Sequence, residues 1–497
     1  MAHNDRQVPE CTSMPSLLRA VRAAEPSAIA LIERSRTITY GELADLVLRT
    51  AGGLLAKGIR PGASVAVAST TSIDGVVAYL GVQAAGGVPA MVNYRATLPE
   101  FEARFAIVDP TLVVVTGSQE IALPGGLSVY RPAGARETDV ERLDGTLHDE
   151  IPVGSETAAA ILFTSGVSGA PRPVPLTHGN LAAAQLGQIN QPSSPLGTAT
   201  IALAALPMAH IYGLNSVLGS LLRSGARIVM MERFDAAGAA ELVTQHQINT
   251  IAAVPQMWNS FLDVGLPEFA FRSVTRATAS AAPLSEKISG PFSEYFGLKL
   301  AGGYGLTESS GTICLDDPKF PHTGTVGRPL GDTVVRLVDR DGDDVEVGDS
   351  GEIWLKGSSM CRTYSASGEL EAPRASGGWY ETGDVGVFDG EGRLCVIDRI
   401  KDVVIVGGFN VSPAEVESVL LKHPGVSHAA VIGEADDRSG ERIVAFVRPN
   451  APGSATTDDL TAHCRRQLAR YKIPARFELR DELPMTDSGK ILRRLLR

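Results

Sequence analysis

The sequence predicts a layered α/β protein with a large N-terminal domain and a small C-terminal α+β domain. Up to about residue 322, amphipathic helical stretches alternate with short apolar runs, which is typical of stacked β/α layers. The chain then changes to strands separated by Gly and Asp turns, which indicate antiparallel hairpins. After a charged stretch near residue 400, helical and strand patterns are mixed again.

The first elements follow from hydrophobic periodicity and from glycine and proline positions. A roughly helical stripe of leucines predicts a helix over residues 41–57. A Pro-Gly pair follows at 61–62, and the apolar run at 64–68 then predicts a strand. Residues 76–85 predict a second helix. The alternation predicts further short, buried strands at 111–116, 198–206, 226–231, 250–254 and 298–300.

The hairpin-rich region is expected to contain strands at 334–338, 351–356 and 393–398. In the pentapeptide 398–402 four of five residues are charged, and we place a domain boundary there. The two domains are therefore expected to span 1–399 and 400–497.

The C-terminal domain contains a helix start that can be recognised from its capping residues. The segment 412–415, Ser-Pro-Ala-Glu, supplies a capping hydroxyl, a proline at the first helical position and a glutamate at the third. The helix is expected to end near residue 423. Leu460, Cys464 and Leu468 suggest a second helix.

The composition excludes several classes of protein. Of 497 residues, 44% are hydrophobic and 20% charged, which excludes disorder for most of the chain. The net charge is -11 and no long Lys/Arg run occurs, so nucleic acid is not an expected partner. Five scattered cysteines without a Cys-x-x-Cys pair argue against a disulfide framework and a zinc site. Without a signal peptide or an apolar run of ~18 residues, we expect a cytoplasmic protein that does not insert into membranes.

Glycine is over-represented: 52 of 497 residues are glycine, which is about 10% against an average of ~7%. This excess indicates that particular segments of the chain need glycine. One such place is the segment 164–172, Thr-Ser-Gly-Val-Ser-Gly-Ala-Pro-Arg, directly after the apolar run 158–163. Backbone N–H groups, hydroxyls and the Arg172 cation in a strand-to-loop position can bind a polyphosphate. The segment is neither a Walker loop nor a nucleophile elbow, and an ordinary glycine loop is the alternative.

Two further segments combine groups that suit a nucleotide. Residues 302–308, Gly-Gly-Tyr-Gly-Leu-Thr-Glu, bring together a flexible backbone, an aromatic ring, a hydroxyl and a carboxylate. Residues 380–384, Tyr-Glu-Thr-Gly-Asp, place Asp384 on a tight turn, where it can accept hydrogen bonds from ribose hydroxyls. Taken alone, these segments are also compatible with a glycine-rich strand end and an ordinary turn carboxylate.

In this order, the segments resemble the adenylate-forming superfamily, which includes acyl-CoA synthetases, aryl-CoA ligases, adenylation domains of peptide synthetases and luciferases. The resemblance covers nearly the whole chain. It also takes in the segments 280–284, 398–402, 407–417 and 484–490. So many motifs in the family's order argue against a chance match.

The resemblance implies an enzyme that joins a carboxylic acid to ATP, releases pyrophosphate and passes the acyl group from the acyl-AMP to a thiol. The implied cofactors are ATP, Mg²⁺ and coenzyme A, and the implied substrate is a small carboxylic acid. The implied fold is a multi-layer N-terminal domain with a small β-barrel-like region, followed by a small mobile C-terminal domain.

The resemblance also assigns the nucleotide site residue by residue. The β- and γ-phosphates would be held by Thr164, Ser165, Gly166, Ser168, Gly169 and Arg172. Tyr304 would stack on adenine, and Asp384 with Arg399 would bind the ribose. The base would be lined by Ala281, Ala282 and Pro283, with Gly305 beside Tyr304.

The catalytic groups implied by the resemblance lie in both domains. Thr307 would contact the α-phosphate and Glu308 would hold Mg²⁺. Lys490 would sit between the substrate carboxylate and the α-phosphate and stabilise the anionic transition state. Lys401 would be the hinge that turns the C-terminal domain, and the Gly407-Gly408 segment would close on the thiol tunnel. A solvated terminal lysine and a charged linker are the alternatives for Lys490 and Lys401.

The acyl pocket is the least determined part of the site. His210, in Pro-Met-Ala-His-Ile-Tyr-Gly, would lie near the substrate carboxylate, although a lone histidine beside apolar residues is more often structural. The pocket wall is expected to draw on Met257, Trp258, Gly302 and Gly303.

The phosphate loop departs from the family pattern. Arg172 replaces the usual lysine and Pro173 the usual glycine, while Val167 and Ser168 replace threonines. A guanidinium fork is not equivalent to an ammonium, and proline lacks a backbone N–H. We therefore expect altered ATP affinity rather than loss of adenylation.

Three functions remain open from the sequence. The first is a stand-alone acyl- or aryl-CoA ligase. The second is a ligase that loads a separate carrier protein, which shares every motif. The third is a nucleotide-binding regulator that has lost activity, which only the altered phosphate loop supports.

Overall fold

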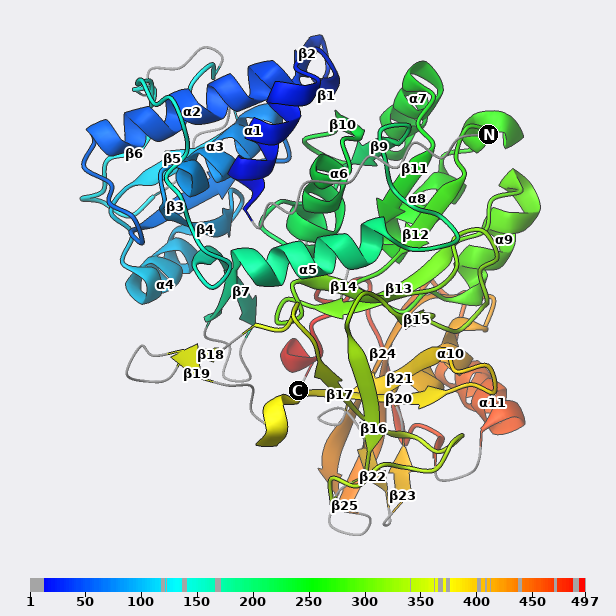
Figure 1. The fold of residues 1–497 in the computed structure, drawn as a ribbon. Coiled ribbons are helices and arrows are strands. Elements are labelled where there is room, and N and C mark those ends of the chain that lie inside the picture. Colours follow the sequence, from blue (N-terminus) through cyan, green and yellow to red (C-terminus); the bar gives the residue numbers. More distant parts are fainter. Residues whose placement is uncertain are drawn as a thin grey trace.

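The computed structural model describes most of the chain. The described residues are 13–117, 121, 123–135, 141–165, 171–339, 341–361, 363–364, 370–371, 376–399, 404–406, 409–411, 413–436, 440–468, 472–485 and 491–496. Within them, two large sheets and two smaller ones carry the architecture (Figure 1).

The first large sheet is six-stranded and built mainly from parallel strands. Its order is β6 (Val129–Tyr130), β5 (Val113–Val115), β3 (Ser64–Ser69), β4 (Val88–Asn93), β7 (Ala158–Ser165) and β8 (Pro171–Thr177). The last pair, β7 and β8, is antiparallel, so β8 forms an edge of the sheet.

The second large sheet is nine-stranded. Its order is β15 (Arg328–Pro329), β14 (Gly311–Leu315), β13 (Ala301–Leu306), β12 (Arg276–Ala279), β11 (Thr250–Ala253), β9 (Ile201–Ala204), β10 (Arg227–Met230), β1 (Ile29–Glu33) and β2 (Arg36–Thr39). The strands from β13 to β1 pair in parallel, whereas both ends of the sheet are antiparallel.

Helices pack around and between these sheets. They are α1 (Met14–Ala24), α2 (Tyr40–Ala56), α3 (Ile73–Ala84), α4 (Leu98–Val108), α5 (His178–Ile189), the π-helix η1 (Tyr212–Gly219), α6 (Ser220–Arg223), α7 (Ala236–His246), α8 (Pro255–Asp263), η2 (Glu268–Phe271) and α9 (Glu286–Phe296). Nearly every residue of α3 is buried, because this helix contacts both β3 of one sheet and β1 of the other. A helix that is apolar on all sides is stable only in such an interior position.

A small antiparallel sheet follows, as the sequence predicts. The short strands β18 (Thr363–Tyr364) and β19 (Leu370–Glu371) pair with each other in a separate two-stranded sheet, with β18 in contact with β8, and the 3-10 turn η3 (Ser376–Gly378) follows them. The small antiparallel sheet contains β16 (Val334–Val338), β17 (Gly351–Lys356), β20 (Tyr380–Phe388) and β21 (Leu394–Arg399). Its hydrophobic core includes Tyr304 and Ile313. The small sheet is therefore packed directly against β13 and β14 of the nine-stranded sheet.

The C-terminal part has its own sheet and hydrophobic core. It consists of β22 (Val404–Val406), β23 (Phe409–Val411), α10 (Pro413–Leu421), β24 (Val426–Asp436), β25 (Gly440–Pro449), α11 (Thr457–Gln467), β26 (Arg476–Leu479) and the turn η6 (Arg493–Leu495). Sheet membership changes between Arg399 and Val404. This agrees with the proposed division into 1–399 and 400–497, which stays a prediction.

Most predicted elements lie where the sequence indicates them, including the helices α2, α3, α10 and α11. One strand was predicted wrongly: residues 298–300 form no strand, and β13 begins at Ala301. The prediction followed the apolar residues Leu298 and Leu300, whereas β13 runs through glycines, which have low strand propensity. Pairing with β12 and β14 on both sides holds this strand in place.

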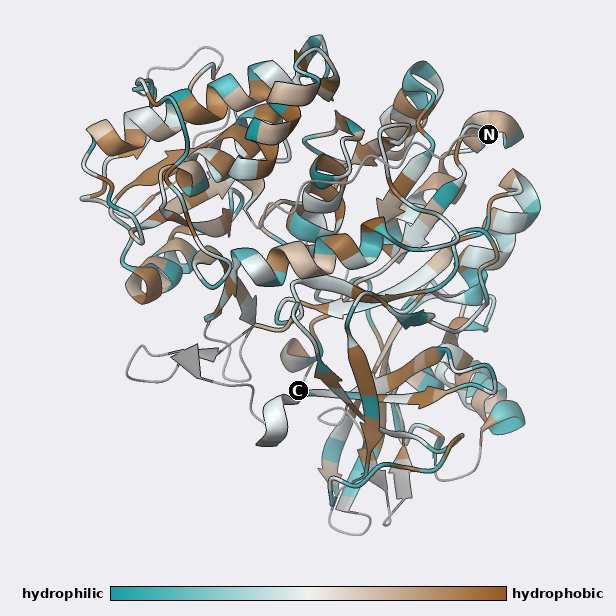
Figure 2. Ribbon diagram, in the orientation of Figure 1, coloured by the Kyte–Doolittle hydropathy of each residue, from teal (hydrophilic) through white to brown (hydrophobic). Residues whose placement is uncertain are grey.

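Hydrophobic residues concentrate on the strands and on the inward faces of the helices (Figure 2). No helix within the described ranges is both long enough and apolar enough to span a bilayer.

The buried His178 at the start of α5 should make stability depend on pH. Burial, helped by the nearby Arg223 cation, lowers the pKa of His178 to about 4. The folded protein keeps this ring neutral while the unfolded chain binds a proton below about pH 6.5, so stability falls as pH drops from about 6.5 to about 4. We expect a total loss of about 3 kcal/mol over this range.

The measurement is the thermal midpoint of the wild type and of His178→Gln at several pH values across that range. The variant should show a flatter pH profile, whereas His148→Gln, at an exposed position, should keep the wild-type slope. An equal slope in all three proteins would contradict the assignment.

Candidate active site

The candidate site lies where parallel strands of the nine-stranded sheet end. Strand β12 ends at Ala279, and the next residue, Ser280, donates a hydrogen bond from Oγ to the carbonyl oxygen of Gly303, 2.8 Å away. The segment 281–283 therefore starts beside the segment 302–308. Ligands of open α/β sheets bind outside the carboxyl ends of the strands, so this edge is the expected place for a site.

Ala281 has a strained backbone at this edge. Its φ is 70°, in the left-handed region that residues with a Cβ rarely adopt. Such conformations persist where the surrounding structure enforces them, and they cluster at ligand sites. The strain lies in the segment that the sequence predicts to line the adenine base.

Tyr304 and Asp384, which are 80 residues apart, form a direct hydrogen bond. Tyr304 Oη donates to Asp384 Oδ2 over 2.6 Å, and both side chains are buried. Burial, followed by the Asp384 charge, raises the pKa of Tyr304 well above its ordinary value, so the phenol stays protonated and donating. The two residues predicted to hold the adenosine are thus in contact.

The turn that carries Asp384 is fixed by its own hydrogen bonds. Gly383 has a φ of 70° and its N–H donates to Glu352 Oε1 at 2.9 Å. The Asp384 N–H donates to Thr382 Oγ1 at 3.0 Å, and that hydroxyl donates to the carbonyl of Ile353 at 2.7 Å. The carboxylate is therefore positioned before any ligand arrives.

Thr307 and Glu308 lie on the turn between β13 and β14. Just before it, a side chain at Gly305 would collide with the carbonyl oxygen of Gly311, so only glycine fits. Ser309 Oγ accepts from the N–H of Leu306 at 2.8 Å and closes the turn. Both predicted catalytic side chains are partly exposed at this end of the sheet.

Charges from two distant segments meet at Cys361. Its N–H donates to the carbonyl of Glu308 at 2.7 Å. Burial and, to a smaller extent, the Glu308 carboxylate raise the pKa of the Cys361 thiol to about 12, while the Arg172 cation opposes the shift. Arg172 of the predicted phosphate loop and Glu308 of the predicted metal site therefore lie in the same neighbourhood.

The predicted phosphate loop starts in β7 and ends in β8, and these two strands pair antiparallel. Thr164 lies opposite Arg172 across this pair. The prolines at 171, 173 and 175 alternate along β8, an edge strand, and an edge position tolerates residues that cannot donate to a neighbouring strand. Pro173, which departs from the family pattern, thus fits the edge of the sheet without breaking it.

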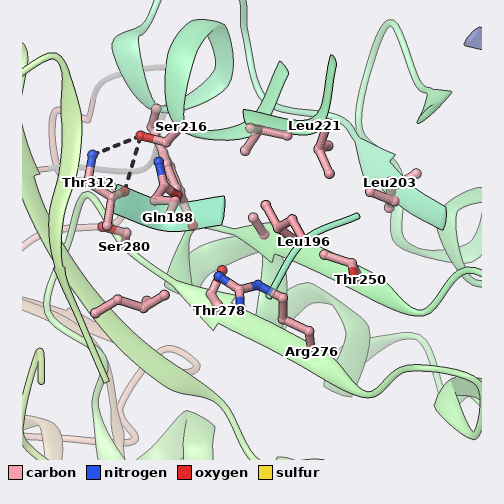
Figure 3. A pocket seen from close by; sticks show the side chains of 15 residues that line it. Gln188, Leu196, Leu203, Ser216, Leu221, Thr250, Arg276, Thr278, Ser280 and Thr312 are labelled. Atoms are coloured by element: carbon pink, nitrogen blue, oxygen red, sulfur yellow. Dashed lines mark hydrogen bonds between the residues drawn. The ribbon is translucent and has the colours of Figure 1, made fainter. Parts of the chain in front are cut away.

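A pocket opens next to this edge, on one face of β12 (Figure 3). Arg276, Thr278 and Ser280 follow each other at two-residue spacing, so all three point to the same face. The cavity among the lining side chains has a volume of about 30 Å³, and the free space rises to about 450 Å³ only when the part open to solvent is counted. The other lining residues are Gln188, Leu196, Ala202, Leu203, Tyr212, Ser216, Val217, Leu221, Thr250, Ala252, Thr312 and Leu315.

The π-helix η1 forms the opposite wall of this pocket. Its i to i+5 hydrogen-bonding pattern widens the helix, and Tyr212, Ser216 and Val217 line the pocket from one side. Ser216 Oγ also accepts from the N–H of Thr312 in β14 at 2.8 Å, which ties this wall to the sheet. Isolated π-helical turns occur frequently at functional sites.

The predicted acyl-pocket residues occupy different positions around this pocket. A side chain at Gly303 would contact Leu315 and Ser280, both of which line it, while one at Gly302 would collide with the carbonyl of Thr325. His210 is exposed, and its Nδ1 accepts from the N–H of Tyr212 at 3.2 Å. Met257 and Trp258 are buried in α8, within the main core.

Several predicted site residues lie outside the described part of the chain. They are Gly166, Ser168, Gly169, Lys401, Gly407, Gly408 and Lys490. For Ser165 and Arg399 only the strand positions are described.

Sequence reasoning missed most of the polar groups in the pocket. Arg276 and Thr278 precede the recognised segment 280–284, and Tyr212 follows His210 by two residues. The available signal was the arginine four residues before the recognised segment, but no strand was predicted from the sequence at this position.

Removing the Tyr304 hydroxyl should destabilise the protein. In Tyr304→Phe the buried Asp384 loses a donor, which should cost about 1–3 kcal/mol of unfolding free energy. Thermal unfolding checks this, with Tyr295→Phe as the control, since the Tyr295 hydroxyl donates to the carbonyl of Leu266 at a half-exposed position. If both variants unfold at the same temperature, the Tyr304–Asp384 hydrogen bond does not contribute to the stability of the protein.

The fold and this site define an adenylate-forming ligase, which activates a carboxylic acid as an acyl-adenylate and passes it to a thiol. The chain belongs to the AMP-binding enzyme family. The model of that family matches residues 18–365, and the model of the AMP-binding enzyme C-terminal domain matches residues 415–490.

Curated relatives match along almost the whole chain. A feruloyl-CoA synthase from an Amycolatopsis species is 32% identical and covers 94% of this chain and 95% of its own length. A 2-succinylbenzoate–CoA ligase from Bacillus subtilis is 31% identical and covers 98% of both chains.

Solved structures match the fold equally broadly. ATP-bound MatB from Rhodopseudomonas palustris superposes with a TM-score of 0.88 at 26% identity, covering 98% of both chains. The o-succinylbenzoate CoA synthetase from Bacillus subtilis, solved with its acyl-adenylate intermediate, has a TM-score of 0.83 at 28% identity and covers 97% of both chains.

Proposed function

We propose that the protein joins a small carboxylic acid to coenzyme A, using ATP and Mg²⁺. The observation that carries this proposal is the Tyr304–Asp384 contact at the edge of the sheet, with the pocket of Figure 3 beside it. Adenosine and acid would then meet at the ends of β12 and β13. The relatives named feruloyl-CoA synthase and 2-succinylbenzoate–CoA ligase support coenzyme A as the thiol.

The proposed chemistry starts from a poor electrophile. A carboxylate resists attack by a thiol, whereas an acyl-AMP has a good leaving group. Tyr304 and the strained segment at Ala281 would hold the adenine, and the preset Asp384 carboxylate would accept hydrogen bonds from the ribose hydroxyls. Arg399 would assist at the ribose.

Charge on the triphosphate would be balanced by residues that meet near Cys361. Arg172 and the loop that starts at Thr164 would bind the β- and γ-phosphates, and Thr307 would contact the α-phosphate. The Glu308 carboxylate lies on the same turn and offers hard oxygen ligands of the type that Mg²⁺ prefers. Bound Mg²⁺ supplies positive charge to the phosphate oxygens.

The C-terminal domain would serve both half-reactions. Lys490 would stabilise the charge that develops as the acid attacks the α-phosphate, and Lys401 would act as the hinge for the change of domain orientation. The Gly407-Gly408 segment would then line the path of the thiol. These roles, and the cytoplasmic location expected from the sequence, remain predictions.

The decisive experiment supplies ATP and a panel of carboxylic acids and measures pyrophosphate exchange. The acyl-adenylate formed is then offered coenzyme A or a purified carrier protein, and products are identified by mass spectrometry. We expect acid-dependent exchange and transfer to coenzyme A. Transfer to the carrier protein alone would replace coenzyme A as the proposed acceptor. ATP binding without exchange for any acid would exclude both ligase functions and favour the nucleotide-binding regulator.

The unusual phosphate loop should tune ATP affinity. Arg172→Lys combined with Pro173→Gly restores the family pattern at both positions, replacing a planar fork with a point charge and adding a backbone N–H. We expect the apparent KM for ATP to change several-fold while acid specificity stays the same, as measured by exchange kinetics. An unchanged KM for ATP would contradict this expectation.

A further inference from the structure

We propose that the pocket beside β12 selects acids that carry a second carboxylate at the end remote from the activated one, and that Arg276 and Tyr212 bind it. This inference rests on the proposed function. It concerns which acid is taken, a property that the nucleotide-binding segments do not determine.

The pocket runs along one strand from the reaction edge into the protein. Ser280 marks the end near the nucleotide segments, and Arg276 marks the other end of the same face of β12. At about 3.3 Å per residue, their backbones are roughly 13 Å apart. In Figure 3 the Arg276 side chain runs back towards Thr278, so its guanidinium points into the pocket.

The Arg276 guanidinium is buried and only partly satisfied. Its Nη1 donates to the carbonyl of Ser194 at 2.5 Å and to Gln191 Oε1 at 3.3 Å. Within the described chain, Nε and Nη2 form no hydrogen bond, and no carboxylate lies within ion-pair distance. Burial lowers the pKa of Arg276 to about 10, while Tyr212 and Asp317 oppose the shift, so the group is still a cation at neutral pH.

A second unsatisfied polar group lies beside it. The Tyr212 hydroxyl is buried and forms no hydrogen bond of normal geometry within the described residues. Burial raises the pKa of Tyr212 to about 12; the side chains of Thr278 and Arg276 are near enough to oppose this shift. A protonated phenol and a guanidinium with free N–H groups together form a donor set for an anionic oxygen.

The apolar walls of the pocket favour a bound anion over an empty pocket. Leu196, Leu203, Val217, Leu221 and Leu315 supply apolar walls, so little solvent is available to the guanidinium. A buried charge without a partner is costly, and a bidentate carboxylate matches the free edge of a guanidinium. An acid with an apolar far end would leave both donors unpaired.

Arg276 has a structural role that the experiment must separate from this one. Through Nη1 it ties the loop that contains Ser194 to the sheet. A variant that only breaks this anchor should harm all acids equally. A variant that removes a binding group should change the ratio between acids.

The test compares matched pairs of acids, each pair consisting of a dicarboxylic acid and the acid of similar shape with an isopropyl group in place of the far carboxylate. Aliphatic chains of graded length and cinnamic acids substituted at the far ring position provide the pairs. Pyrophosphate exchange gives kcat/KM for each. We expect the best dicarboxylic acid to exceed its partner by about 100-fold or more, since sites built for hydrogen bonds reject analogues that lack them.

Three variants test which residues cause the preference for dicarboxylic acids. Arg276→Met should abolish the preference and Tyr212→Phe should reduce it. Gln191→Leu removes an acceptor of Arg276 without changing the pocket donors, and it should leave the ratio unchanged. If Arg276→Met does not fold, the kcat/KM ratios of the wild-type enzyme for the paired acids still test the proposal.

Two outcomes would overturn the inference. One is a wild-type enzyme that uses the apolar member of every pair as well as or better than the dicarboxylic acid. The other is an equal loss for both members in Arg276→Met. Absence of exchange with any acid would instead contradict the proposed function, so the two failures are distinguishable.

Discussion

Replacing Lys490 with methionine is expected to slow acyl-adenylate formation by about 100- to 1,000-fold, the range found when one donor to a developing anion is removed. The proposed role places the ammonium between the attacking carboxylate and the α-phosphate. Methionine keeps much of the side-chain length but not the charge, so the loss should appear in the first half-reaction. Transfer of the acyl group from a synthetic acyl-adenylate to coenzyme A should remain close to wild type.

Single-turnover measurements of the two half-reactions check this prediction. The matched control is Lys422→Met, because Lys422 is an exposed lysine just beyond α10 of the same domain. The control should retain both half-reactions. Equal slowing of both half-reactions in Lys490→Met would indicate a structural defect, and an unaffected first half-reaction would remove Lys490 from the chemistry.

Replacing Trp258 with alanine is expected to lower the unfolding free energy by about 3–5 kcal/mol, as for other large buried aromatic residues. Trp258 is completely buried, and its ring packs against Phe261 and Phe292 with centroids 5.8 and 5.1 Å apart. Its Nε1 donates to the carbonyl of Thr278 at 3.1 Å. The substitution therefore leaves a cavity and also frees the backbone of β12, the strand that carries the pocket.

Thermal and denaturant unfolding of Trp258→Ala provide the measurement. Phe269→Ala, which removes an aromatic ring that is 63% exposed near the same cluster, should stay within about 0.5 kcal/mol of wild type. Because β12 also lines the acid pocket, we expect the KM for the acid to rise more than the KM for ATP. Equal stability of the two variants would show that the aromatic cluster is not a major part of the core.

The order of the nucleotide segments was predictable because each depends on local backbone chemistry. Gly305 must be glycine because the adjacent strand leaves no room for a Cβ, and glycine is favoured at position 383 because its φ is positive. Such requirements are visible in a short stretch of sequence. The contact between Tyr304 and Asp384 could be predicted only through the family resemblance.

The acid pocket was largely not predictable. Arg276 and Tyr212 are 64 positions apart and come from a strand and a π-helix, and neither element carries a sequence signal that aims its side chain at the other. Strand β13 shows the same limit, because pairing on both sides makes a strand out of glycines that have low strand propensity.

By itself, the sequence determined the α/β class, the succession of nucleotide-binding segments and the family that they indicate, because helix caps, turns and close backbone approaches depend on neighbouring residues. Only the tertiary structure decided which polar groups share a pocket and which of them lack partners. Burial and pairing depend on how distant segments pack. On the surface Arg276 would be a solvated charge, whereas at the buried start of β12 its guanidinium has N–H groups available for an anion.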